Sequence, residues 1–106
     1  MRNPDSTTIA PDVLHSIARL TALKVPGVHG TSPRRGAPEG VQIKVTDNLV
    51  DVDIYLILEK DLNLRNVSRD VQMAIARAIE EMVGMQAGTI NIHIEDIYFP
   101  PIDGKD

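Results

Sequence analysis

The first half of the chain shows a helical spacing of apolar residues followed by two stretches of strand-like alternation. From Pro11 to Lys24, apolar residues recur at three- and four-residue steps, which predicts a helix. The stripe consists of Val13, Leu14, Ile17, Ala18, Leu20 and Thr21. Proline is tolerated at the first helical position because the N–H it lacks has no partner there, and Pro26-Gly27 ends the pattern.

A hairpin is predicted next. Val41–Thr46 and Val50–Leu58 alternate apolar and polar residues, and Asp47-Asn48 lies between them as a two-residue turn. The facing pairs would be Thr46 with Leu49, Val45 with Val50, Lys44 with Asp51, and Ile43 with Val52. A slip of one residue would break both the apolar and the charged matches, so the pattern predicts this register.

A longer helical pattern follows, and then a last strand. Asn63 is an N-cap residue type, and Gly84 stands at the position where a helix commonly ends. The predicted buried face of this helix comprises Leu64, Val67, Val71, Ala74, Ile75, Ala78, Ile79 and Met82. The strand Gly88–Ile97 is predicted to direct Ile90, Ile92 and Ile94 inward and Asn91, His93 and Glu95 outward.

These elements predict an α+β fold, a two-layer sandwich with two helices on one face of a small mixed sheet. The order is (β)-α-(β)-β-β-α-β, where the bracketed strands are Thr7-Thr8-Ile9 and one beginning at Val28-His29. The last strand is expected to run parallel to Val50–Leu58 through the helical crossover. We expect one domain over 9–98 with a mobile loop at 30–40, a flexible N-terminus at 1–8 and a tail at 99–106.

The composition of the chain limits which partners it can bind and in which cellular compartment we expect it. The chain has 15 acidic and 11 basic residues and a net charge of −4, which argues against nucleic acid or an anionic membrane as the main partner. The absence of cysteine fits a reducing cytoplasm. The longest apolar run, Ile54–Leu58, is far shorter than the roughly 20 residues of a membrane span, and the first residues do not resemble a signal peptide.

The outward positions of the predicted sheet carry the candidate interaction surface. Asp53, Tyr55 and Ile57 share one face of a strand, and His93 lies on the polar face of the last strand. Two readings stay open: a contact patch for another subunit or protein, or a strand end covered by the N-terminal segment or the long loop. Asp51, Asp53, His93 and Glu95 could also be read as metal ligands. A solvated polar sheet face is the favoured explanation, because no recognised metal spacing is present and an exposed flat sheet is a poor cage.

The remaining motifs give little indication of ligand binding or catalysis. Arg34 and Arg35 in the loop are candidate contacts for a phosphate or an acidic partner, or a solubilising pair. The segment Gly27 to Gly30 fits the short GxxG pattern of KH nucleic-acid modules but lacks basic flanks. Without a cysteine, a GxSxG setting or a Gly-rich phosphate loop, we expect no catalytic residue, no cofactor, no metal and no enzymatic activity.

The order and spacing of several segments resemble the alkaline-shock-protein family, envelope-stress-response proteins of mainly Gram-positive bacteria. The segments are Ile9–Val13, Ile17-Ala18, Val25–Val28, Val41–Val45, Val50–Leu58, Val71-Gln72, Ala78–Met85 and Ile90–Ile94. The resemblance implies a non-enzymatic cytoplasmic protein that self-associates, with some relatives held beneath the membrane by a membrane-anchored partner.

We therefore expect a protein-interaction or scaffold module of the envelope stress response. Like the relatives that self-associate, it is expected to be a homo-oligomer. Two alternatives stay open. One is an RNA- or ribosome-associated α/β module, because helix–hairpin–helix–strand folds occur among RNA-binding domains. The other is a metal-dependent enzyme that uses the acidic and imidazole groups of the sheet face.

Overall fold

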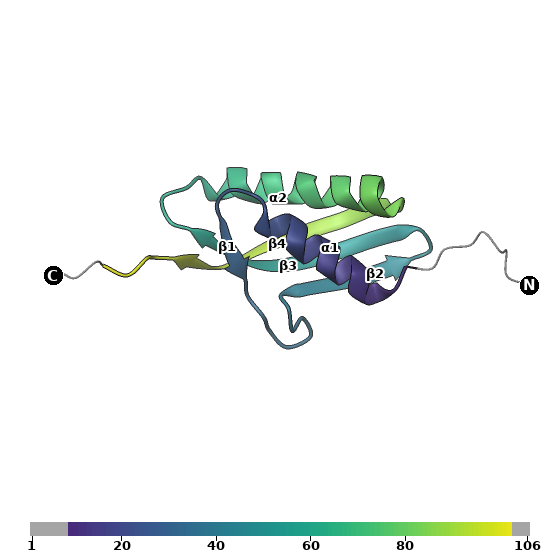
Figure 1. Ribbon diagram of the computed structural model, residues 1–106, viewed down its shortest axis with the longest axis horizontal. Helices are drawn as coiled ribbons and strands as arrows, with labels where there is room; N and C mark the ends of the chain where they lie inside the picture. The colour runs from purple at the N-terminus through teal and green to yellow at the C-terminus, as the bar shows by residue number, and fades with distance from the viewer. Residues whose placement is uncertain (1–8, 103–106) are drawn as a thin grey trace, which may run out of the picture.

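The computed structural model describes residues 9–102 and shows a sheet covered on one face by two helices (Figure 1). The helices are α1 (Pro11–Leu23) and α2 (Leu64–Ala78), and a short π-helix, η1 (Ile79–Val83), continues α2. The strands are β1 (Val28–Thr31), β2 (Val41–Thr46), β3 (Leu49–Glu59) and β4 (Gln86–Tyr98). The predicted α+β two-layer sandwich is confirmed. Thr7 and Thr8 of the candidate first strand lie outside the described residues, as do segments 1–8 and 103–106.

β3 is the central strand of the sheet. β4 pairs with it in parallel from Leu49 to Glu59, as the crossover prediction requires. β2 pairs antiparallel with its first half and β1 antiparallel with its last residues. Because β4 occupies one edge of β3 throughout, β1 and β2 lie end to end along the other edge. The sheet is therefore mixed, with four strands.

The change from β2 to β1 occurs at Tyr55. The Ser32 N–H donates to the Tyr55 carbonyl at 2.8 Å, and the Tyr55 N–H donates to the Gly40 carbonyl at 2.8 Å. The loop between β1 and β2 thus completes the backbone pairing of β3 at the junction. In Figure 1 this loop projects from the long side of the molecule away from α2.

The hairpin has the predicted register. Val45 pairs with Val50, Ile43 with Val52, and Lys44 with Asp51. Asp47 in the turn has a φ of 55°, a conformation that Asp tolerates better than most residues.

The core lies between the helices and β3. Alternate residues of β3, namely Val50, Val52, Ile54, Leu56 and Leu58, are each 0% exposed. Leu14, Ala18 and Ala22 of α1 and Val67, Val71 and Ile75 of α2 pack in the same cluster. The i, i+4, i+8 spacing on each helix places these residues on one face, and their burial is the main stabilising contribution to the fold.

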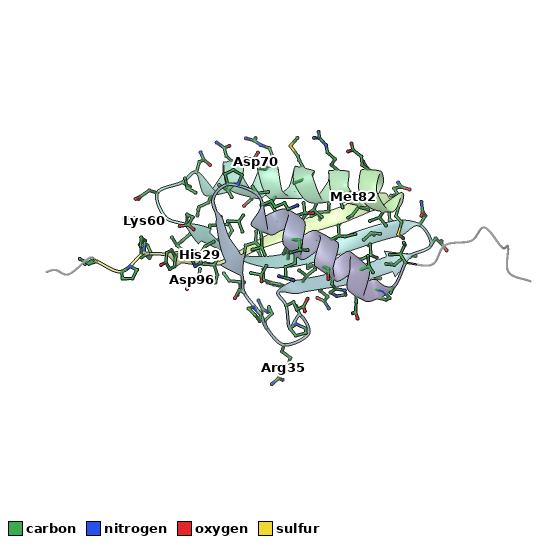
Figure 2. The ribbon with its side chains drawn as sticks, viewed as in Figure 1. His29, Arg35, Lys60, Asp70, Met82 and Asp96 are labelled. Atoms are coloured by element: carbon green, nitrogen blue, oxygen red, sulfur yellow. The ribbon has the colours of Figure 1, made fainter. Side chains whose placement is uncertain are left out.

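Several predicted core positions are wrong. Val13 and Leu20 are 46% and 50% exposed, because α1 directs the row containing Leu14, Ala18 and Ala22 at the sheet instead. Met82, beyond the end of α2, is 71% exposed (Figure 2). It lies in the π-helix, whose wider turn places Val83 against the core in its stead.

Ile94 was predicted inward and is 37% exposed. It lies on the edge strand, immediately before a register shift at which Glu95 has no partner on β3. Such a bulge bends the strand and changes the directions of nearby side chains. β4 is also longer than predicted, since Gln86 still pairs with Leu49 and Tyr98 with Glu59.

Within the described residues, no helix combines the length and the apolarity that a bilayer-spanning helix requires.

Replacing Ile75, which is 0% exposed, with alanine is expected to destabilise the fold by about 2–5 kcal/mol, because the change removes buried methyl groups and leaves a cavity. Met73→Ala on the same helix is the matched control, since Met73 is 59% exposed and its loss should change stability by less than about 0.5 kcal/mol. Urea denaturation followed by circular dichroism measures both. Equal midpoints for the two variants would contradict the assigned core.

Candidate interaction surface

The sheet face opposite the helices carries the residues singled out from the sequence. Alternation along β3 places Asp53, Tyr55 and Ile57 on this face, because the intervening residues point into the core. His93 of β4 is the direct register partner of Tyr55. The structure therefore brings Asp53, Tyr55 and His93 together. All three are half-buried, although no helix covers them.

Tyr55 is the centre of this group. Its ring stacks on the His93 ring with centroids 4.4 Å apart and an interplanar angle of 16°. The Arg34 guanidinium carbon lies 4.5 Å from the centroid of the Tyr55 ring, within cation–π range. Arg34 reaches the sheet because a local turn fixes its backbone, with the Arg34 N–H donating to the Ala37 carbonyl at 3.0 Å.

Charged groups around Tyr55 are paired with one another. Nε2 of His93 lies 2.8 Å from Oδ1 of Asp53, and Nδ2 of Asn91 donates to the same oxygen at 3.2 Å. Arg34 Nη1 lies 3.2 Å from Oε1 of Glu95. The face therefore presents an aromatic pair surrounded by charges that already have local partners.

The metal-ligand reading of this face is not supported. Asp51 accepts a hydrogen bond from the Thr89 N–H at 2.8 Å, while Glu95 pairs with Arg34 instead of approaching Asp53 and His93. Over residues 9–102, no three or more carboxylate or imidazole side chains are grouped so that they could hold a metal ion.

Two further candidate residues, Ile57 and Arg35, lie outside the cluster around Tyr55. Ile57 is half-buried and pairs with Gly30 on β1 and Asp96 on β4, so the β1 side offers it no side chain. Arg35 is exposed and lies at the tip of the loop, away from the sheet (Figure 2). Of the two loop arginines, only Arg34 contacts the surface described here. The loop thus covers part of Tyr55, while Ile57 stays half-buried.

A second cluster lies at the far end of the sheet. The His29 ring stacks on Tyr98 with centroids 3.7 Å apart and planes 7° apart, and Nδ1 of His29 lies 3.1 Å from Oε2 of Glu59. Figure 2 shows His29 at the end where β4 leaves the sheet. The sequence analysis missed this cluster because it depends on the pairing of both β1 and β4 with β3. The only signal was that Tyr98 immediately follows the predicted last strand.

The fold and this face define a class: a small sheet domain, covered by helices on one side, with a flat and internally paired polar surface on the other. The chain belongs to the alkaline shock protein 23 family, described as having a cell envelope-related function, and the family match spans residues 2–99. The family resemblance seen in the sequence is thereby confirmed.

Two similar bacterial proteins carry the description uncharacterized. The chain is 29% identical over 98 residues to Spy1535 of Streptococcus pyogenes serotype M6, covering 84% of this chain and 76% of that protein. It is 29% identical over 102 residues to YqhY of Bacillus subtilis strain 168, covering 86% of this chain and 76% of that protein.

Among solved structures, the fold is similar to that of MamM CTD. A nickel form of a MamM CTD variant superposes with a TM-score of 0.63 at 12% identity, covering 80% of this chain and 96% of that one. Another MamM CTD variant gives a TM-score of 0.65 at 13% identity, covering 82% and 98%. At this identity the likeness concerns the fold alone.

Arg34→Ala is expected to move the ring-proton resonances of Tyr55, because the guanidinium that lies over the ring is lost. The loss of stability should stay below about 1 kcal/mol, since the Arg34–Glu95 pair is largely solvent-screened. Arg35→Ala removes an equal charge from the same loop and should leave the Tyr55 resonances in place. Proton NMR of the two variants checks this, and matching spectra would contradict the Arg34 contact.

Proposed function

We propose that this protein is a non-enzymatic interaction module that self-associates as part of the cell-envelope stress response. The family description supports the link to the envelope. The observation that carries the proposal is the sheet face around Tyr55, Ile57 and His93, where large side chains lie on a surface that no helix covers.

This face has the composition expected of a contact surface. Aromatic side chains are enriched at the centres of protein interfaces, where they contribute large contact areas with little loss of side-chain freedom. Tyr55 and His93 are stacked on each other and therefore already ordered. A partner that covers them would gain apolar contact without having to fix flexible groups.

The charges on this face are also compatible with burial. Asp53 lies 2.8 Å from His93 and Arg34 pairs with Glu95, so each of these four side chains keeps a polar partner when the face is covered. A second copy of the chain, related by a two-fold axis, would place the same flat patch on both sides of the contact. Self-association through this surface is the arrangement we favour.

The location that we propose is the cytoplasm, at the inner face of the membrane and through a membrane-anchored protein partner. The support for it is the resemblance to envelope-stress proteins seen in the sequence. In this arrangement, the sheet face mediates self-association and a different surface binds the membrane-anchored partner.

Replacing Tyr55 and Ile57 together with lysine should weaken self-association at least about tenfold, because two like-charged groups would meet across the contact. Sedimentation velocity over a range of protein concentrations measures the effect. Both positions are half-buried surface sites, so the circular dichroism spectrum should stay that of the unmodified protein.

The matched control places two lysines on the helical face, at Val13 and Leu20, which are 46% and 50% exposed. It adds the same charge to the opposite layer and should leave sedimentation unchanged. If the sheet-face variant sediments like the unmodified protein, the patch does not mediate assembly.

A further inference from the structure

A different surface, the outer edge of β4, also has the features of a binding site. In the part of the chain that the structure describes, β4 pairs with β3 alone. Its other edge therefore has no strand partner along its 13 residues. Edge strands are commonly protected by lysine, proline or a bulge. Gln86–Tyr98 contains no lysine or proline, and its register shifts, at Gly88–Thr89 and at Glu95, lie outside the stretch Ile90–His93.

α2 runs beside this edge and forms a groove with it. The groove has a volume of about 490 Å³ and is lined by Arg65, Ser68, Arg69 and Gln72 of α2 and by β4 from Ile90 to His93. The four helical residues are spaced i, i+3, i+4 and i+7, so they form one stripe along the helix. A helix that flanks an open strand edge is the arrangement in which extended peptides are bound by strand addition.

One hydrogen bond shows that the strand edge is within reach of the helix. Nε2 of Gln72 donates to the carbonyl oxygen of Ile90 at 2.8 Å. This carbonyl thus points away from β3. Since backbone groups alternate in direction along a strand, the N–H and C=O of Ile92 point to the same outer edge.

The charge of the groove identifies the kind of segment that fits. None of its lining residues carries a carboxylate, although the chain as a whole has a net charge of −4. Arg65 and Arg69 are exposed and form no ion pair within residues 9–102, whereas Arg77 of the same helix pairs with Glu81. Arg69 donates to Oδ1 of Asn66 at 2.6 Å, which holds one arm of its guanidinium in place.

We propose that this groove binds an extended acidic segment of a partner protein, which adds to the sheet as a further strand beside β4. Backbone groups of the segment pair with Ile92 and its neighbours, and carboxylates at alternate positions pair with Arg65 and Arg69. A guanidinium can hold a carboxylate through two parallel hydrogen bonds, which gives preference for acidic residues over other polar ones.

The test uses the full chain and three synthetic eight-residue peptides. The first alternates valine and glutamate, the second alternates valine and lysine, and the third repeats the first with alternate backbone nitrogens methylated. We expect the first peptide to bind and to shift the amide resonances of Ile90–Ile94. The lysine peptide and the methylated peptide should each bind at least about tenfold more weakly, because they lose the charge match or the strand pairing.

Variants of α2 locate the site. The double variant Arg65→Ala and Arg69→Ala should weaken binding of the glutamate peptide at least about tenfold and reduce its salt dependence. Arg77→Ala removes one charge from the same helix outside the groove and should leave the affinity unchanged. All three positions are exposed, so each variant should retain the fold.

The inference is wrong if the glutamate peptide does not bind, if the three peptides bind equally, or if Arg77→Ala has the same effect as the double variant. It is also wrong if a single-stranded RNA of eight nucleotides binds the groove more tightly than the peptide. Loss of self-association in the Arg65/Arg69 variant would indicate that a second copy of the chain occupies the groove. The sheet-face variant at Tyr55 and Ile57 should still bind the peptide, so the two proposals can fail separately.

Discussion

The pairing of β3 on both of its edges, combined with complete burial of one of its faces, is the constraint on which the rest of the structure depends. Val50, Ile54 and Leu58 are 0% exposed beneath the helices, and backbone partners run along both sides of the strand. Because side chains alternate along a strand, this burial fixes which residues must face away from the helices. The position of Tyr55 on the open face is thus a consequence of how the core is packed.

The open face is organised by the strands that flank β3. β4 brings His93 against Tyr55, while the junction between β1 and β2 brings Arg34 to the same ring. Arg34 and His93 each contact a carboxylate of a different segment, Glu95 and Asp53. The result is a polar surface whose side chains around Tyr55 contact one another, whereas Arg65 and Arg69 of α2 beside β4 form no ion pair within residues 9–102. The open face of the sheet and the outer edge of β4 therefore suit different kinds of contact.

The sequence was sufficient for the elements, the hairpin register and the parallel crossover, because each of these follows from a local period or a nearby turn. Asp47-Asn48 and the alternation on either side of it left one register that matched both faces. Side-chain positions that depend on irregular backbone or on contacts between distant elements could not be predicted from a local period. Met82 fits the period of α2, but the π-helix changes that period, and Ile94 fits the alternation of β4 only up to the bulge at Glu95. Similarly, Asp53, Tyr55 and His93 could be assigned to one face, but the contact of Arg34 with Tyr55 and the stack of His29 on Tyr98 require the tertiary arrangement.

The parallel partnership of β3 and β4 also affects how the protein is made. Asp51 and Thr89, which hydrogen bond across these strands, are 38 residues apart, whereas the hairpin partners of β3 are adjacent in the sequence. During synthesis β3 leaves the ribosome well before β4. The edge of β3 that pairs with β4 therefore has no partner at a time when the hairpin can already form. During that interval the unpaired edge of β3 exposes the new chain to aggregation, and docking of α2 shortens the interval by bringing β4 alongside.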